Sequence, residues 1–228
     1  MEIYLQRAPK MKSIQVYEQL KAELINGKWD FGEKILVNEL IEKFKVSRRP
    51  VMDALKMLEN DGFVQIIPQS GCKVVDYEKK DVIDQLLLSS ALESLAAELA
   101  VIHHTPEQIQ LLEDFQNQSK QNIVKLVDKV AYFKYNREFH YHILSMTHSP
   151  KIIKHAMQMW DLNDFYLLNL FEHSKFDVFE SLEFHDQVMH AIRDKQVEKA
   201  KESMRKHFEN YVNKLAERLP AQPLKRKQ

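Results

Sequence analysis

The chain has 228 residues, 44% apolar and 29% charged, which suits one large domain or two ordinary ones with packed cores. Its 33 basic and 33 acidic residues cancel, so the overall charge gives no sign of nucleic-acid binding and any basic surface must be local. A single cysteine, Cys72, excludes an internal disulfide, and no apolar run reaches the roughly 18 residues needed to cross a bilayer. The N-terminus lacks the apolar core of a signal peptide. We therefore expect a cytoplasmic protein without a membrane partner.

The first part of the chain predicts three helices. Apolar residues recur at three- and four-residue steps from Ile14 to Ile25, and Gly27 follows as a stop signal. After a turn in "DFGEK", a short helix is expected over 37–44. A third helix begins after Ser47, the expected N-cap, and ends before Gly62.

A small β-hairpin is predicted after these helices. Apolar, largely β-branched residues flank "PQSG" in "FVQIIPQSGCKVV", with the turn near Ser70 and Gly71. Three helices followed by a hairpin form the pattern of a winged helix-turn-helix domain, which we place at residues 10–77.

The rest of the chain predicts only helices. "TPEQ" supplies Thr105 as N-cap, Pro106 at the first helical position and Gln108 to close a capping box. The expected helices lie at 82–104, 106–120, 122–147, 150–172, 178–193 and 197–219. We therefore predict a mainly α protein with a C-terminal all-α bundle at 79–219 and a flexible tail at 220–228.

Arg48 and Arg49 are the candidate DNA-binding residues of the third helix. In a helix-turn-helix, the N-terminal residues of the second helix contact base edges, and Arg can bind guanine O6 and N7 or a phosphate. Gly71 and Lys73 of the hairpin are placed to approach the flanking DNA backbone or the minor groove. The alternative is that both arginines are ordinary solvated surface residues.

Four residues of the helical region could bind a divalent metal ion. Asn136 and His140 are four residues apart, on one face of a helix. His185 and His207 come from two later helices, and one oxygen with three imidazoles would leave coordination positions open. Spacing alone does not establish that these helices meet.

Residues 16–75 resemble the DNA-binding domain of GntR-family bacterial transcription regulators. The resemblance rests on "FGEKI", "NEL", "VSRRPV", "DGFV" and "SGCKVV". It implies operator-DNA contacts by Asn38, Ser47, Arg48, Arg49, Met52, Gly71 and Lys73. The family usually has Arg at positions 38 and 52, Thr at 49 and Gly at 45. These departures favour a changed operator sequence rather than lost binding.

Residues 79–219 resemble the FCD ligand-binding domain of the FadR-like branch of that family. "NREFH", "FHDQV" running to "AI", and "MRKH" match its metal-binding motifs. The resemblance implies a divalent metal held by Asn136, His140, His185 and His207. Asn in place of the usual Asp favours Zn²⁺, with Ni²⁺ tolerated. Many relatives carry an effector-binding Arg where this chain has Ser89, and Tyr132 and Tyr135 are further effector-pocket candidates.

Together these features predict a homodimeric transcription regulator, a repressor rather than an enzyme, that releases operator DNA when a small organic acid binds at the metal. A metal-responsive regulator, with the ion itself as effector, is one alternative. A metal-dependent hydrolase is another, although no general base is evident. Cys72 is read as a small apolar strand residue rather than a redox sensor.

Overall fold

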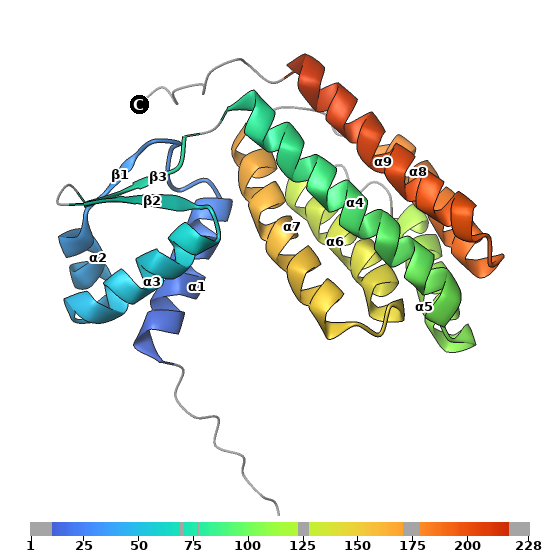
Figure 1. The fold of residues 1–228 in the computed structure, drawn as a ribbon, viewed down its shortest axis with the longest axis horizontal. Coiled ribbons are helices and arrows are strands. Elements are labelled where there is room, and N and C mark those ends of the chain that lie inside the picture. Colours follow the sequence, from blue (N-terminus) through green and yellow to red (C-terminus); the bar gives the residue numbers. More distant parts are fainter. Residues whose placement is uncertain (1–10, 69–70, 77, 123–127, 171–177, 219–228) are drawn as a thin grey trace, which may run out of the picture. The chain divides into compact units, whose positions relative to one another are not determined.

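The structure of the protein is a computed structural model, and it describes residues 11–68, 71–76, 78–122, 128–170 and 178–218. Figure 1 labels the helices and strands. By their contacts the described residues divide into two compact units. The first runs to residue 76 and also includes 165–170, and the second holds the remainder.

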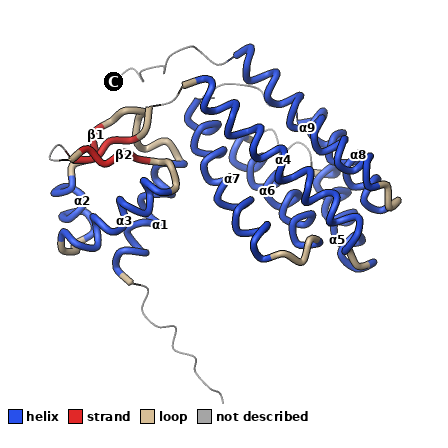
Figure 2. The backbone as a smooth tube through the Cα atoms, viewed as in Figure 1, coloured by secondary structure: helices blue, strands red, loops and turns tan. Residues whose placement is uncertain are grey.

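The first unit contains three helices and a small antiparallel sheet, which Figure 2 shows as its red strands. In chain order the elements are α1 (Lys12–Ile25), β1 (Lys34–Ile35), α2 (Val37–Phe44), α3 (Arg48–Asn60), β2 (Val64–Ile67) and β3 (Gly71–Val74). The inner faces of the helices supply a core of fully buried side chains, among them Leu20, Leu40, Val51, Leu55 and Leu58. The predicted winged helix-turn-helix fold is therefore confirmed.

One strand was not predicted. The segment expected to be only a turn places Lys34 and Ile35 in β1, which pairs with β3 so that the strand order is β1-β3-β2. Ile35 lies opposite Cys72 and is 1% exposed. Two residues are too short for the alternation of apolar and polar side chains that marks a strand in a sequence.

Local backbone geometry sets the angle between α2 and α3. Lys45 ends α2 in the left-handed conformation, with φ 51° and ψ 48°. Ser47 is the N-cap of α3 in an extended conformation, as predicted, although its side chain makes no capping hydrogen bond. Beyond the end of α3, Gly62 has a φ of 84°, which glycine adopts without strain.

The second unit consists of helices and their connections in every part that the structure describes. Its helices are α4 (Lys79–His103), α5 (Pro106–Gln121), α6 (Lys129–Met146), α7 (Pro150–Leu170) up to residue 164, α8 (Val178–Arg193) and α9 (Val197–Arg218). The predicted capping box is present: the Thr105 hydroxyl accepts from the Gln108 N–H at 3.3 Å, and the Gln108 side chain accepts from the Thr105 N–H at 3.0 Å.

The start of α6 differs from the prediction. The helix expected from residue 122 begins instead at Lys129, because Asn122 caps α5 with bonds to carbonyls of that helix. Several predicted segments lie outside the described residues. They are residues 123–127 of the same expected helix, residues 171–172 and 219 at the ends of two other expected helices, Ser70 of the wing turn and the tail 220–228.

Helix α4 is the core helix of the second unit. It packs against α9, α6 and α8, and Ala96 joins Leu144, Ala156 and Trp160 in a buried cluster. By length and apolar composition alone, one window of α4 could cross a membrane, whereas the sequence analysis found no apolar run of that length. A core helix of a bundle has the same composition, and the buried inner face of α4 accounts for it.

Candidate metal centre and DNA-reading helix

Arg48 and Arg49 lie at the first two positions of α3, and both are exposed. Neither makes an ion pair or hydrogen bond with any residue that the structure describes. The first turn of α3 also contains no acidic residue. Two unpaired guanidinium groups therefore stand at the positive end of a helix dipole, an arrangement that an anionic partner would stabilise.

The other DNA-binding candidates occupy the same unit. Asn38 is exposed on the second residue of α2, and Met52 is partly exposed on α3. Gly71 starts β3 with a φ of 108°, a conformation that other residues rarely adopt. Lys73 is already engaged, because its Nζ lies 2.8 Å from Asp76 Oδ2. That any of these residues touches DNA remains a prediction.

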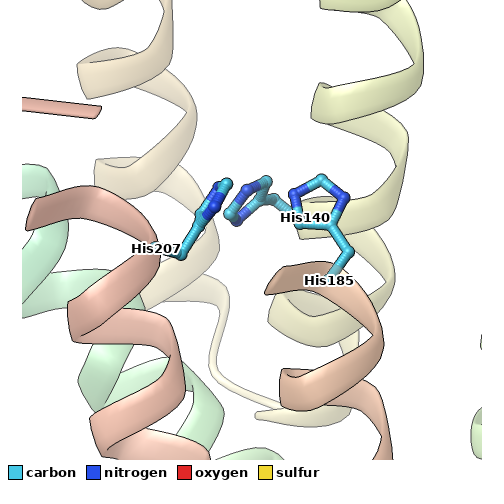
Figure 3. Close-up of side chains that lie close together, drawn as sticks. All are labelled: His140, His185 and His207. Atoms are coloured by element: carbon cyan, nitrogen blue, oxygen red, sulfur yellow. The ribbon is translucent and has the colours of Figure 1, made fainter. Parts of the chain in front are cut away.

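Three of the four predicted metal ligands come together. His140 of α6, His185 of α8 and His207 of α9 each offer one ring nitrogen, and these nitrogens lie within 4.8 Å of one another. Figure 3 shows the three rings facing one another from their separate helices. His140 and His185 are buried, at 2% and 0% exposure, and Phe139 stacks on His185 with ring centroids 3.9 Å apart.

Asn136 is the fourth predicted ligand. It lies one helical turn before His140 on α6 and is partly buried. No hydrogen bond joins its side chain to the described residues. Its participation in the centre remains a prediction from the spacing.

A chain of hydrogen bonds fixes the tautomer of His185. The Gln116 amide nitrogen donates to the Leu182 carbonyl and to Asp186, so its oxygen faces Tyr135 and accepts from that hydroxyl at 2.8 Å. The Tyr135 hydroxyl has only one hydrogen, so its oxygen accepts from His185 Nδ1 at 2.5 Å. His185 Nε2 therefore carries a lone pair, and it is buried without a partner.

His140 is held from its other side. Its Nδ1 lies 3.2 Å from Oε2 of Glu93, a residue of α4 that is 1% exposed. The second oxygen of Glu93 accepts from the Trp160 indole N–H at 2.7 Å. Because a carboxyl oxygen accepts at Nδ1, the lone pair of His140 is at Nε2, the other ring nitrogen.

Burial keeps the remaining ring nitrogens neutral. Desolvation lowers the pKa of His207 to about 3, with repulsion from His140 adding to the effect, and it lowers the pKa of His185 well below the ordinary value. His207 Nδ1 is buried and has no partner. Metal binding requires neutral imidazoles, so both rings are in the state that coordinates an ion.

The three histidines fit a divalent metal ion such as Zn²⁺. Two nitrogens bound to one ion at about 2.1 Å can be at most about 4.2 Å apart, so closure around an ion needs only small ring movements. The unpaired buried nitrogens His185 Nε2 and His207 Nδ1 would otherwise remain a net cost to folding. Such an ion would keep coordination positions that the three imidazoles do not fill.

The effector-pocket candidates have different surroundings. Tyr135 is linked to the centre through His185, whereas the Tyr132 hydroxyl donates to Ser181 at 2.9 Å. Ser89 is buried, donates to the Gln85 carbonyl and accepts from Asn163 at 3.0 Å. The Asn163 amide oxygen is buried without a partner.

Glu93, Trp160 and Gln116 were missed by the sequence reading. Glu93 did carry a signal, since it lies in helical phase with Leu86, Ser89 and Ala97 on the buried face of α4, where a carboxyl group is rare. Trp160 and Gln116 carried none, because their partners lie on other helices, 67 residues away for Trp160 and 19 to 70 residues away for Gln116.

Comparison with known proteins decides the family. Residues 12–74 match the sequence model described as bacterial regulatory proteins, gntR family, and residues 86–210 match that of the FCD domain. The protein belongs to the GntR family of transcription regulators, in the group with an FCD domain. As a GntR regulator it is a DNA-binding protein and not an enzyme, so the hydrolase alternative falls.

Relatives of this GntR regulator match it over most of its length. The HTH-type transcriptional regulator YdhC of Bacillus subtilis is 26% identical and covers 86% of this chain and 87% of its own. The Uxu operon regulator of Haemophilus influenzae is 28% identical, covering 89% and 81%. The solved structure of Escherichia coli McbR/YncC has a TM-score of 0.72 at 21% identity and covers 91% and 98%. At that identity it supports the fold.

Proposed function

We propose that this GntR regulator is a homodimeric repressor whose hold on operator DNA is controlled by a small organic acid bound at a divalent metal. The observation that carries the proposal is the convergence of three imidazoles from α6, α8 and α9, two of them buried and the third partly exposed. Such a set binds a metal and leaves room for a further donor from a ligand. A carboxylate oxygen would serve as that donor.

The DNA-reading surface is assigned to the start of α3. Arg48 and Arg49 are exposed and unpaired among the described residues, and Asn38 and Met52 are accessible on the same unit. In this proposal the guanidinium groups contact guanine edges or phosphates, Asn38 contacts an adenine edge, and Met52 contacts a thymine methyl. Gly71 and Lys73 approach the flanking backbone.

An apolar face on α4 supports the homodimer. Leu88, Leu95 and Ile102 are 57%, 41% and 58% exposed and follow one another at seven-residue steps, so they line one side of the helix. A second copy would cover this stripe and bring two reading heads to a palindromic operator. We expect Leu95→Glu to yield monomers in sedimentation velocity, while Leu111→Glu on α5, 58% exposed in the native chain, leaves the dimer intact.

Operator binding tests the DNA assignment. Fluorescence anisotropy with duplexes from the region upstream of its own operon should show salt-dependent, sequence-selective binding. The double variant Arg48→Ala/Arg49→Ala should lose about 100-fold or more, since each specific Arg–base pair is worth about 1–3 kcal/mol. Lys151→Ala/Lys154→Ala removes the same charge from exposed positions of α7 and should bind normally. Equal affinity of the two double variants would refute the assignment.

The metal assignment is tested by elemental analysis and by titration of chelator-treated protein with Zn²⁺ and Ni²⁺. His140→Gln, His185→Gln and His207→Gln should each bind far more weakly than the native chain. His190→Gln changes an exposed histidine on the same helix as His185 and should bind normally. Retention of full affinity by all three site variants would contradict the proposal.

The burial of the centre favours one second candidate, in which the metal ion is itself the effector. His140 and His185 are almost wholly enclosed, which suits an ion better than a large ligand. DNA affinity measured with chelator, with metal, and with metal plus candidate organic acids separates the two. A change on adding metal alone favours metal sensing, and a change that needs the acid favours the organic-acid effector.

A further inference from the structure

A buried carboxyl group touches the candidate metal centre without being one of its ligands. Glu93 lies in the middle of α4 and is 1% exposed. Each of its two oxygens has one partner: Oε1 accepts from Trp160 Nε1 at 2.7 Å, and Oε2 lies 3.2 Å from His140 Nδ1. No other carboxyl oxygen bonds to any of the three histidines among the described residues.

Fold stability alone gives a poor reason for a carboxyl group at this position. Trp160, one of its two partners, belongs to an otherwise apolar buried cluster with Ala96 on α4 and Ala156 on α7. Taking a carboxyl group out of water is costly, and apolar residues of similar volume often replace buried ionic groups without loss. A function beyond packing therefore accounts better for Glu93.

We propose that Glu93 is a positioning residue of the metal centre, which holds His140 in the tautomer that turns an Nε2 lone pair toward the ion. The inference rests on the metal site of the proposed function. A carboxyl oxygen accepts a hydrogen at Nδ1 and cannot donate one when ionised, so only the Nδ1–H tautomer satisfies the contact. A carboxylate next to the three imidazoles would also favour a cation at the centre.

Trp160 fixes which atom of the side chain at position 93 faces His140. An indole N–H can only donate, so the group at position 93 must present an oxygen to it. In Glu93→Gln the amide oxygen would face Trp160 and the amide nitrogen would face His140. The nitrogen would donate to Nδ1, and the proton of His140 would move to Nε2, where it blocks the metal position.

The experiment compares Glu93→Gln with the native chain after chelation. We expect metal affinity to fall about 10–100-fold, the range typical when such an outer partner is lost. The imidazole ¹⁵N resonances of His140, assigned through His140→Gln, should show Nδ1–H in the native protein and Nε2–H in the variant. The metal-free variant should unfold at the same temperature as the metal-free native chain or higher, because a buried charge is removed.

Glu98→Gln is the matched control, because Glu98 lies on the same helix but is 30% exposed and pairs with Lys201. It should leave metal affinity and the His140 resonances unchanged. Native-like affinity in Glu93→Gln, with metal bound by the native chain, would overturn the positioning role alone. A lower unfolding temperature of the metal-free variant with an unchanged His140 tautomer would also overturn it, since that result marks a purely structural residue. Absence of metal binding by the native chain would instead overturn the proposed centre.

Discussion

Replacing Lys45 by glycine should raise the stability of the first unit, because it relieves backbone strain. The same replacement should lower the affinity for operator DNA. The φ of 51° at Lys45 places a lysine in the left-handed region at the end of α2. The left-handed conformation costs a non-glycine residue about 1–2 kcal/mol. Glycine also destabilises the folded state by about 0.4–1 kcal/mol, because it increases the conformational entropy of the unfolded chain. Lys45→Gly should therefore stabilise the first unit by about 0.5–1 kcal/mol.

We expect the lysine side chain to contact a DNA phosphate, which would offset this strain. Lys45 is exposed in the turn between α2 and α3 and makes no ion pair within the described residues. A phosphate contact there would be lost in Lys45→Gly. Operator affinity should fall by a similar factor for all sequences, and the slope of log affinity against log salt should shrink by about 0.9.

Lys195 provides the control for the backbone effect. It has a φ of 54° just beyond α8, so Lys195→Gly relieves the same strain in the second unit. Thermal unfolding followed by circular dichroism should show both variants stabilised, and anisotropy should show weaker operator binding only for Lys45→Gly. A destabilised Lys45→Gly would refute the strain argument, and unchanged affinity with an unchanged salt slope would refute the phosphate contact.

Three further predictions concern single side chains. Thr105→Ala removes the acceptor of the capping box and should lower the free energy of unfolding by about 1 kcal/mol in denaturant titrations. Thr105→Ser keeps a hydroxyl and should retain most of that stability. An equal loss in both variants would contradict the cap. Gly71→Ala places a residue with a side chain at a φ of 108° and should lower the free energy of unfolding by more than about 1 kcal/mol in the same titrations. An unaffected variant would mean that the hairpin relaxes. Burial raises the pKa of the Cys72 thiol to about 11, so about one molecule in 1,000 is thiolate at pH 8. Iodoacetamide should therefore label the native chain far more slowly than the denatured chain. Equal labelling rates would disprove the burial.

Most of the fold could be predicted because its signals are local. The Thr105-Pro106-Glu107-Gln108 segment contains everything that a capping box needs within four residues, and it forms as expected. The three helices and the hairpin of the first unit follow from apolar periodicity and turn residues. Strand β1 escaped prediction because Lys34 and Ile35 become a strand only through pairing with β3, which lies nearly 40 residues further along the chain.

The candidate site could be predicted only in part. His140, His185 and His207 were recognisable from their motifs, and three helices bring their nitrogens together. The tautomers of these rings depend on Glu93 and on the pair of Tyr135 and Gln116, which reach the site from α4, α6 and α5. No spacing within one helix encodes such contacts.

The amino-acid sequence by itself determined the order of helices, the hairpin, the exposed arginines at the head of α3 and the identity of the histidines, because periodicity, caps and charge act over a few residues. Only the tertiary structure decided that the three imidazoles meet, that Glu93 stands behind one of them, and that Lys73 is paired with Asp76. Packing brings distant helices within hydrogen-bond distance, and burial then shifts the pKa of His207 to a value that its sequence neighbours do not reveal.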